Sequence, residues 1–352
     1  MSAAGTDGAG PSKEQESLLR MVYGAQGAQV IYVAAKLGLA DCIASGTQHS
    51  AGLAQSAGID EPTAQRLLRG LASLGICEEV ETGRFALTGM GQYLRADHPQ
   101  SLQARVLFNS EVLWPVWGAM LETVRSGNAG AMQVFGMPFY DYLQAQPESG
   151  RLFDRTMADA IRYRVEPALA AYDFSRFRKV VDIGGGNGTL VRTILQRWPH
   201  LEGVVFDLPS VAQRAGREIG DGALDARYAV QAGNALERVP EGADCYVMSN
   251  FIVSLADDDA ATILRNCRQA MAGDGTVVII EWIMPTPGES AAPFTRWDAA
   301  SMDLNMLAIH GRGGWRVRTS DEFRRLLQQA GFVLSRIIPT RSSVSVLECV
   351  AG

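Results

Sequence analysis

The chain has 352 residues, of which 47% are hydrophobic and 20% are charged, and its formal net charge is −6. This length is enough to bury a large core and favours two domains. The negative charge argues against a nucleic-acid surface, because phosphate neutralisation needs clustered Lys and Arg. The sequence has no apolar run long enough to cross a bilayer and no signal-like N-terminus. We therefore expect a cytoplasmic protein without a membrane partner.

The cysteine spacing and the lack of metal-binding motifs argue against disulfides and metal centres. The cysteines are scattered without CxxC spacing, which favours free thiols over disulfides or zinc. No HxH, HExxH or DxD pair stands at a predicted strand end near the glycine-rich turn described below. Three aspartates, residues 257–259, precede a predicted helix over 260–271, where acidic side chains favour the helix dipole. We therefore predict that the protein holds no metal.

Residues 1–12 are predicted to form a flexible tail, followed by an N-terminal domain over residues 13–100. Apolar residues at helical spacing predict two successive amphipathic helices within 14–39, with Gly24 and Gly27 loosening the junction. Such an apolar stripe requires a partner surface.

Residues 51–95 have the arrangement of a winged helix, with helices over 51–57 and 61–74 and a hairpin over 77–87 that turns at Gly83. Winged helices often bind DNA, but acidic side chains flank the second helix here and would repel phosphates. These are Asp60, Glu61, Glu78, Glu79 and Glu81. A role in dimerisation and in the wall of a pocket is the preferred interpretation.

Residues 101–170 are predicted to form helices rich in aromatic side chains, which lead to a domain over residues 171–352. There, predicted strands alternate with helices, a pattern typical of parallel βαβ units in an open doubly wound sheet. The predicted strands are 180–183, 204–206, 228–231, 245–252, 277–282, 332–339 and 344–350, with a helix over 320–330. Ligands of such sheets bind beyond the carboxyl ends of the strands. The side chains expected on this rim are Asp207, Gly233, Asn234, Ser249 and Glu281.

A glycine-rich turn follows the first of these strands. Residues 184–188 are Gly-Gly-Gly-Asn-Gly and precede a predicted helix over 189–197. Glycine allows backbone angles that a Cβ forbids, and the free N–H groups of a helix N-terminus attract an anion. Asp207 ends the next apolar strand, about 20 residues later, where a carboxylate binds the hydroxyls of a ribose. These features predict a nucleoside cofactor, either a dinucleotide or S-adenosylmethionine (SAM).

Five segments of the chain resemble the SAM-dependent small-molecule O-methyltransferases of plant phenolic and bacterial polyketide pathways. They are DIGGGNG at 182–188, FDLP at 206–209, AYDF at 171–174, ILRNCR at 263–268 and DLNML at 303–307. The resemblance covers nearly the whole chain from about residue 18. It implies an α/β class I methyltransferase with a Rossmann-like sheet, a mainly helical winged-helix dimerisation domain and a homodimer. It also implies SAM as cofactor, S-adenosylhomocysteine as product and a small aromatic or polyketide-like substrate.

The resemblance further implies which residues bind the cofactor. Asn234 stands where relatives have an aspartate that binds the adenine amino group, and an asparagine carbonyl still accepts that bond. Ala235 replaces an aromatic neighbour, and Ser249 stands where relatives reach the methionine carboxylate. The complete implied set is Asp182, Gly184, Gly185, Gly186, Asp207, Leu208, Gly233, Asn234, Ala235, Ser249 and Asn250.

The usual catalytic histidine of the family is missing. Alignment on Ile263 places Val253 at the histidine and Ser254 at the aspartate of the family's LHDWDD segment. A second family carboxylate falls on Val317, so that Glu281 alone remains of the trio. Because a phenol with a pKa of about 10 is mostly protonated at neutral pH, a positioned base is worth about 10²- to 10⁴-fold in rate.

The candidates for a substitute base are Glu281 and His310, the latter in a loop that closes the substrate cavity in relatives. Asp303 is expected to bind backbone or to cap a helix. The implied substrate contacts are Met157, Arg162, Val253, Trp297, Met302, Asn305 and Met306. Five arginines fall in the same region and either hold an anionic substrate or pair with the protein's own acids. They are Arg162, Arg164, Arg296, Arg312 and Arg316.

Two functions follow from these residues. The first is methyl transfer without the family histidine, supported by alignment of the acceptor with the methyl group. The second is a SAM-binding enzyme of the same fold that performs hydroxylation, decarboxylation or a pericyclic or cyclisation step instead.

Overall fold

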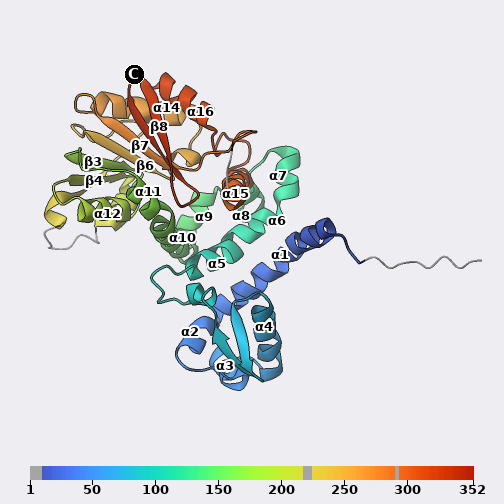
Figure 1. Ribbon diagram of the computed structural model, residues 1–352. Coiled ribbons are helices and arrows are strands. Elements are labelled where there is room, and N and C mark those ends of the chain that lie inside the picture. The colour runs from blue at the N-terminus through green and yellow to red at the C-terminus, as the bar shows by residue number, and fades with distance from the viewer. Residues whose placement is uncertain (1–9, 217–223, 290–292) are drawn as a thin grey trace, which may run out of the picture. The chain divides into compact units, whose positions relative to one another are not determined.

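The computed structural model describes residues 10–216, 224–289 and 293–352, without the side chains of Ile161, Arg162, Asp225, Pro293 and Phe294. Most of the tail predicted over residues 1–12 lies outside this part. The chain forms two compact units, Met1–Leu113 and Trp114–Gly352, and each is described by itself (Figure 1).

The first unit is mainly helical around a two-stranded antiparallel sheet. Its elements are α1 (Lys13–Lys36), α2 (Leu39–Ala44), α3 (Ser50–Ala57), α4 (Glu61–Ser73), β1 (Cys77–Glu81), β2 (Arg84–Leu87), η1 (Gly91–Leu94), α5 (Gln103–Phe108) and η2 (Asn109–Leu113). Leu53, Leu68 and Phe85 expose none of their surface and lie in one buried cluster with residues of α1, α2 and β1. The predicted helix–helix–hairpin arrangement is therefore confirmed.

The prediction of two helices within 14–39, joined near Gly24 and Gly27, is wrong. A single helix, α1, runs through both glycines and begins with a capping box in which Ser12 and Gln15 exchange hydrogen bonds. An isolated glycine costs a helix only about 1 kcal/mol, which the rest of this long helix tolerates. The N-terminal half of α1 leaves large apolar side chains exposed, among them Leu18 at 64% and Met21 at 77%.

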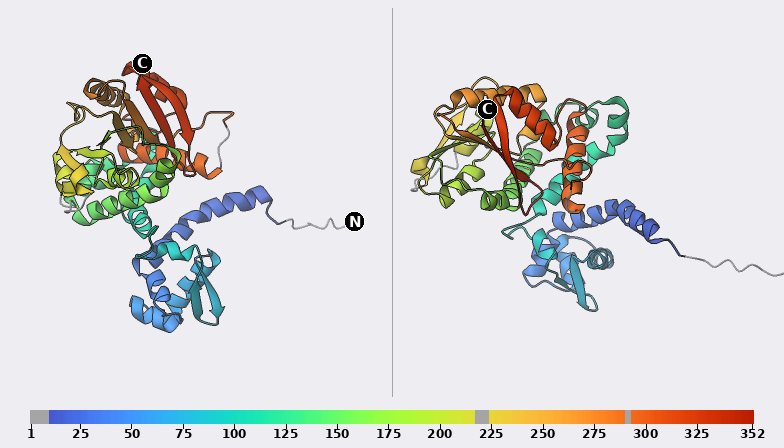
Figure 2. Two further views of the ribbon diagram at one scale, coloured as in Figure 1. Left: turned by 60° about the vertical axis from the view of Figure 1, so that its left-hand side comes forward. Right: turned by 45° about the horizontal axis from the view of Figure 1, so that its top comes forward.

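The second unit begins with a run of short helices, as predicted for this region. They are α6 (Trp114–Gly118), α7 (Met120–Ser126), α8 (Gly130–Phe135), α9 (Phe139–Ala145), α10 (Pro147–Ala160), the π-helical turn η3 (Ile161–Val165) and α11 (Glu166–Ala171). Helix α15 (Pro293–His310) comes from much later in the chain and packs against α6, α7 and α8. Figure 2 shows α15 in orange beside these green-blue helices.

A seven-stranded sheet forms the rest of the second unit, in the order β5-β4-β3-β6-β7-β9-β8. The strands are β3 (Lys179–Ile183), β4 (Glu202–Asp207), β5 (Tyr228–Ala232), β6 (Cys245–Ser249), β7 (Thr276–Glu281), β8 (Phe332–Pro339) and β9 (Ser345–Ala351). The first five are parallel, and β8 and β9 are antiparallel. The predicted doubly wound sheet with a terminal antiparallel hairpin is thus confirmed.

Helices cover both faces of this sheet. Helices α14 (Asp257–Ala270) and α16 (Ser320–Gln329) pack on the side chains of Val181, Tyr246 and Ile279. Helices α12 (Thr189–Arg197) and α13 (Pro209–Gly216) pack against β3, β4 and β5. The central strands β3, β4, β6 and β7 are buried on both faces, so they appear in the sequence as continuous apolar runs rather than alternating ones.

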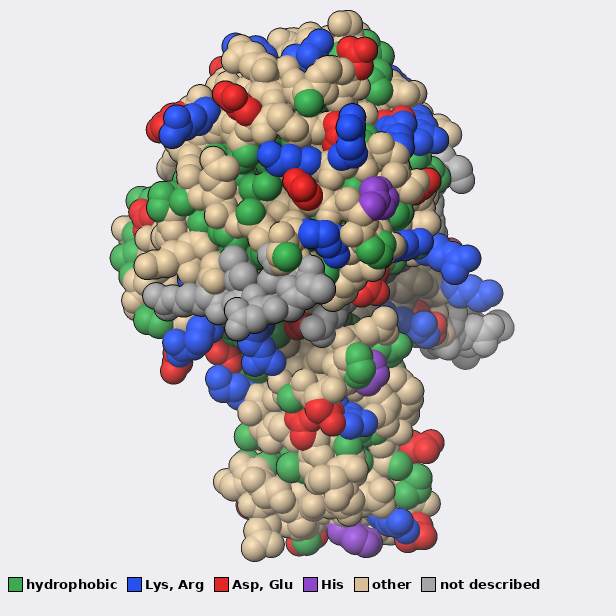
Figure 3. All heavy atoms as spheres, turned by 90° about the vertical axis from the view of Figure 1, so that its left-hand side faces the viewer, with side chains coloured by type: hydrophobic (Ala, Val, Ile, Leu, Met, Phe, Trp, Pro, Cys, Tyr) green, Lys and Arg blue, Asp and Glu red, His purple; other side chains and the backbone are tan. Residues whose placement is uncertain are grey.

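None of the described helices is long and apolar enough to cross a membrane. On the face drawn in Figure 3, Lys and Arg side chains are interspersed with Asp and Glu.

Candidate functional site

The carboxyl ends of the parallel strands bring the predicted cofactor residues to one rim of the sheet. Gly184 follows β3, Asp207 ends β4 and Gly233 follows β5. Ser249 ends β6, and Glu281 ends β7. The rim therefore contains residues nearly 100 positions apart in the chain, at the place where open α/β sheets bind their ligands.

The turn after β3 needs its glycines for two different reasons. Gly184, Gly186 and Gly188 have φ of 73°, 59° and 79°, values that side chains with a Cβ rarely adopt. A Cβ on Gly184 would also lie 2.4 Å from the Phe251 ring, whereas one on Gly186 would meet no atom within 4 Å. The turn thus keeps a bare backbone, with free space above Gly186.

Two carboxylates stand beside this turn. Asp182 is 2% exposed, and burial raises its pKa well above the usual range, with Asp207 adding a like charge. Asp207 accepts the Gly186 N–H at 2.9 Å and the Leu208 N–H at 2.7 Å. Burial raises the pKa of Asp207, and these two hydrogen bonds oppose the shift. Asp207 is therefore held beside the turn, at the position where the sequence predicted that its carboxylate binds the hydroxyls of a ribose.

The segment after β5 forms a tight turn around Asn234. The Asn234 side chain accepts the Leu236 N–H at 3.1 Å and donates to Glu237 at 3.3 Å. Its carbonyl oxygen retains a second lone pair for a further donor. Gly233 leaves room for the Phe206 ring, which lies 2.6 Å from where its Cβ would be. Ala235 is partly buried against the core, and Leu208 is 51% exposed.

Beyond β6, two buried polar atoms lack partners. The strand predicted over 245–252 ends at Ser249 because Asn250 takes a left-handed backbone with φ of 52°. The Ser249 hydroxyl and the Asn250 Oδ1 are buried without a hydrogen-bond partner among the described residues. Buried polar groups are nearly always satisfied, so these two atoms fit a site that a polar ligand completes. Together with the bare glycine turn, they suit a nucleoside cofactor.

The segment onto which the resemblance places the family histidine forms a short turn, η5 (Ile252–Ser254). Val253 is 3% exposed, and its N–H donates to Glu281 Oε2 at 3.1 Å. The other oxygen of Glu281 accepts the Trp282 N–H at 3.2 Å. Burial raises the pKa of Glu281 to about 7, against the opposing effects of both N–H groups and of Arg318 and Arg164. This carboxyl is therefore poised to exchange a proton near neutral pH.

His310 lies in an aromatic cluster rather than among charged groups. Its ring centroid is 3.6 Å from that of Trp315, 5.9 Å from Tyr140 and 6.3 Å from Phe139. Burial lowers the pKa of His310 to about 3, so its imidazole is neutral at physiological pH and a weak base. Tyr140 exposes 40% of its surface, yet burial around its hydroxyl raises its pKa and Ser254 hydrogen-bonds to it.

The predicted substrate contacts lie on four elements, α10, η3, η5 and α15. Met302, Asn305 and Met306 lie on α15, where the Asn305 Oδ1 accepts the Trp117 indole N–H at 3.0 Å. Trp297, on the same helix, is 62% exposed. Met157 is partly buried on α10. The side chain of Arg162 lies outside the described residues.

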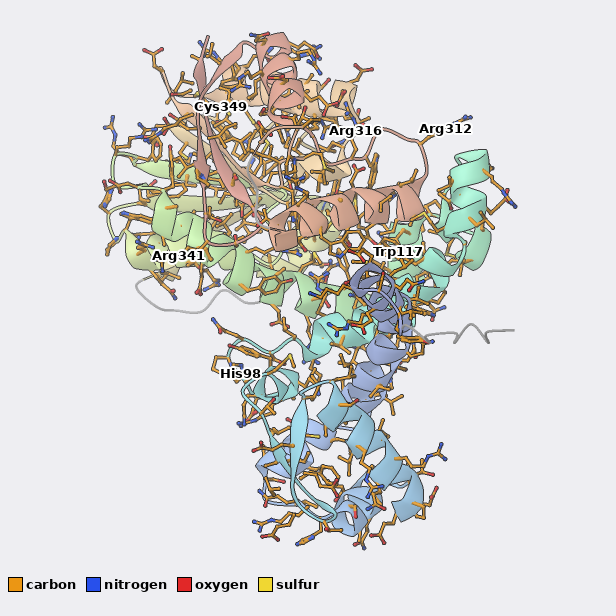
Figure 4. The ribbon with its side chains drawn as sticks, turned by 45° about the vertical axis from the view of Figure 1, so that its right-hand side comes forward. His98, Trp117, Arg312, Arg316, Arg341 and Cys349 are labelled. Carbon is orange, nitrogen blue, oxygen red and sulfur yellow. The ribbon has the colours of Figure 1, made fainter. Side chains whose placement is uncertain are left out.

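Most of the other arginines pair with the protein's own groups. Arg164 lies 3.7 Å from Asp298 and 4.5 Å from the centre of the Trp282 ring, whose N–H donates to Asp298 at 2.8 Å. Arg316 pairs with Asp257 at 3.0 Å and with Glu322. Arg296 donates to a backbone carbonyl, and Arg312 is exposed, pointing outward in Figure 4. Asp303 accepts the Val317 N–H at 2.9 Å, which confirms the predicted bond to backbone.

Two contacts of this region were not predicted from the sequence, those of the buried Arg318 and the hydrogen bond between Ser254 and Tyr140. Arg318 is 1% exposed and binds the turn 252–255, and the Ser254 hydroxyl joins Tyr140. No short-range pattern distinguishes a buried arginine from a solvated one. Within the described residues, no group of three or more His, Cys, Asp or Glu side chains could hold a metal ion.

Two family models match this chain. The model of the O-methyltransferase domain matches residues 117–333, and that of the O-methyltransferase dimerisation domain matches residues 19–97. Phenazine O-methyltransferase PhzM of Lysobacter antibioticus is 35% identical over 332 residues, which cover 94% of each chain.

Solved structures are similar over nearly the whole chain. The crystal structure of LaPhzM has a TM-score of 0.87 and 34% identity, covering 97% of this chain and 100% of that one. The O-methyltransferase NcsB1 from neocarzinostatin biosynthesis was solved with SAM and 2-hydroxy-5-methyl naphthoic acid. It has a TM-score of 0.75 and 30% identity, and the match covers 92% of this chain and 96% of that chain.

Proposed function

This chain belongs to the family of SAM-dependent O-methyltransferases, and we propose that it methylates a hydroxyl group on a small planar aromatic natural-product intermediate. The observation that carries the proposal is the rim itself. Its cofactor side has the bare glycine turn, Asp207 and the two unpartnered polar atoms, while its other side has Glu281 with a pKa of about 7. SAM supplies an electrophilic methyl group and leaves as S-adenosylhomocysteine.

The cofactor is assigned to residues of the turn and the strand ends. Asp207 would bind the ribose hydroxyls, and the Asn234 carbonyl would bind the adenine amino group. Ser249 and Asn250 would satisfy their buried oxygen atoms on the methionine part. The other residues of this assignment are Asp182, Gly184, Gly185, Gly186, Leu208, Gly233 and Ala235.

Glu281 is proposed as the base in place of the family histidine. A base works best when its pKa is near the working pH, and the pKa of Glu281 is about 7 whereas that of His310 is about 3. Glu281 would take the proton that the acceptor hydroxyl loses. A buried carboxylate has more than two lone pairs, so its hydrogen bonds to Val253 and Trp282 do not prevent this.

The aromatic cluster suits a planar acceptor without charge on its rings. Neutral His310, Trp315 and Tyr140 offer stacking surfaces. Val253 and methionines of α10 and α15 would complete an apolar wall. The proposed contacts remain Met157, Arg162, Val253, Trp297, Met302, Asn305 and Met306.

We also propose a cytoplasmic homodimer formed through the first unit. The dimerisation model matches residues 19–97, and the exposed apolar side chains in the N-terminal half of α1 support such an interface. Light scattering of the wild type against a Leu18→Asp, Met21→Asp variant tests it, with loss of the dimer expected for the variant.

The function is tested by methyl transfer from methyl-labelled SAM to a panel of hydroxylated phenazines and 2-hydroxy-5-methyl naphthoic acid. We expect a labelled product and an equal amount of S-adenosylhomocysteine from at least one acceptor. An acceptor that is consumed without release of S-adenosylhomocysteine would contradict methyl transfer and favour non-methylating chemistry. The Asp207→Ala protein serves as a control, since at a SAM concentration below its raised Kd it should transfer less label than the wild type.

A further inference from the structure

Arg318 is a fully buried cation beside the turn 252–255. It stands between Val317 and the start of α16, and only 1% of its surface is exposed. Removing a guanidinium from water costs several kcal/mol unless its donors are paired. The partners of Arg318 therefore indicate which part of the molecule requires it.

Those partners are two carbonyls of one short turn and one carboxylate. Arg318 Nη1 donates to the Ile252 carbonyl at 2.8 Å, and Nη2 donates to the Leu255 carbonyl at 2.7 Å. Its Nε donates to Asp257 Oδ1 at 2.9 Å, in the first turn of α14. The planar fork thus spans both ends of the turn, which a lysine ammonium could not do with the same geometry.

The turn is also held from the opposite side of its backbone. The N–H of Val253 donates to Glu281 at 3.1 Å. The Glu281 carboxyl therefore holds an N–H group of the turn while the buried guanidinium holds two of its carbonyls. Within the turn, the Leu255 N–H also donates to the Ile252 carbonyl at 3.1 Å. Since the Val253 side chain has no polar atom, the position of Val253 depends on these backbone contacts.

We infer that Arg318 is a positioning residue for methyl transfer: its guanidinium fixes the backbone of 252–255, so that Val253 and Glu281 meet the acceptor in one arrangement. The inference rests on the proposed function, since it takes this turn to face the acceptor. A displacement of about 1 Å at a reacting group can reduce a rate about 10²-fold. We call the hydrogen bonds from Arg318 to the Ile252 and Leu255 carbonyls the clamp. Its loss should therefore reduce kcat/KM far more than it weakens SAM binding.

Arg318 also acts on Glu281 through its charge. Two cations lower the pKa of this carboxyl, Arg318 from the loop before α16 and Arg164 from η3, alongside the N–H groups of Val253 and Trp282. Removing the positive charge of Arg318 raises the pKa of Glu281. The pH at which the rate rises should then move upward, and a weaker Val253 hydrogen bond to Glu281 in a loosened turn would move it in the same direction.

Arg316 provides a matched control. It stands two residues away, in the same loop, and is labelled in Figure 4. Within the described part of the chain, its hydrogen bonds go to Asp257 and Glu322 and none goes to the turn. Arg316→Met therefore removes a neighbouring cation that binds the same aspartate while leaving the clamp in place.

The test compares Arg318→Met, Arg318→Lys and Arg316→Met in the full-length protein. Hydrogen exchange of the amides of residues 250–256 needs no acceptor. We expect it to rise about 10-fold or more in Arg318→Met, by a smaller factor in Arg318→Lys, and not in Arg316→Met. With the acceptor found in the panel above, kcat/KM should fall about 10²-fold in Arg318→Met, with a SAM Kd within about threefold of wild type. Arg318→Lys should restore the pH profile but not the full kcat/KM.

The outcomes separate the inference from the proposed function. Unchanged hydrogen exchange in Arg318→Met would overturn the inference that Arg318 fixes the backbone of 252–255. Raised exchange with an unchanged kcat/KM would show that the clamp exists but does not position the reaction. If the wild type methylates no acceptor, the proposed function fails and the positioning role fails with it, whatever the exchange shows. If Arg318→Met does not fold, Arg318→Lys is compared with Arg316→Met by hydrogen exchange and by kcat/KM. Equal values in these two variants would overturn the inference.

Discussion

The cofactor side and the acceptor side of the proposed site are formed by different kinds of chemical groups. On the proposed cofactor side, at the ends of β3, β4, β5 and β6, the candidate recognition groups are backbone N–H groups, positive-φ glycines, two buried polar oxygens and one carboxylate. On the proposed acceptor side, the turn 252–255 is held between the buried side chains of Glu281 and Arg318. The first side depends on the local sequence, and the second depends on side chains that only the fold brings together. Variants on the acceptor side should therefore change the rate, and variants on the cofactor side should change binding.

The largest effect is expected from Glu281→Gln. Since a positioned base contributes about 10²- to 10⁴-fold, kcat should fall within that range while the SAM Kd changes little. In the wild type, protonation of Glu281 removes the base, so the rate should fall as the pH drops through about 7. A pH–rate profile of both proteins measures this. His310→Phe is the control and should retain most activity, because a histidine with a pKa of about 3 is a weak base. A larger loss in His310→Phe than in Glu281→Gln would reverse the assignment.

Gly184→Ala should have the next largest effect, on stability and on SAM binding. A left-handed backbone with a Cβ costs about 1–2 kcal/mol, and crowding the Phe251 ring adds about 1–3 kcal/mol. Gly186→Ala carries the same kind of backbone cost without any neighbour, so it isolates the second contribution. Urea unfolding and calorimetry with SAM measure both variants. Equal losses of stability in the two would show that the Phe251 ring is not the constraint.

Asp207→Ala should weaken SAM binding by a smaller amount. A hydrogen bond to a charged group is worth about 1.5–3 kcal/mol, which corresponds to a Kd about 10- to 100-fold higher. Isothermal titration with SAM gives the Kd directly. Glu202→Gln, at the exposed opposite end of the same strand, should bind SAM like the wild type. An unchanged Kd in Asp207→Ala would remove this residue from the cofactor site.

The smallest effect concerns stability against pH. The pKa of Glu281 is about 7 in the folded protein and about 4.3 in an unfolded chain, so the folded state binds this proton more tightly. Between these values, raising the pH therefore costs stability. Glu281→Gln cannot ionise, so its Tm should decline less than that of the wild type between pH 5 and pH 8. Scanning calorimetry at the two pH values tests this, and parallel declines would mean that Glu281 does not titrate in this range.

By itself, the sequence determined those elements that short stretches of residues specify. Alternating apolar strands and helices predicted the doubly wound sheet, and the DIGGGNG and FDLP segments predicted the glycine turn and Asp207, because glycine spacing and strand ends are visible in short stretches. It misjudged α1, where interior glycines suggested a break that the long capped helix does not make, and it extended β6 past the left-handed Asn250.

Only the tertiary structure decided how the acceptor side is arranged. A pKa near 7 for Glu281 results from burial, opposed by two N–H groups and two arginines from distant segments, and no spacing in the sequence encodes that balance. The same holds for His310, which the aromatic cluster makes a weak base, and for Arg318, whose donors meet a turn more than 60 residues away. Desolvation and charge pairing depend on what surrounds a group in space, so these properties exist only once the chain has folded.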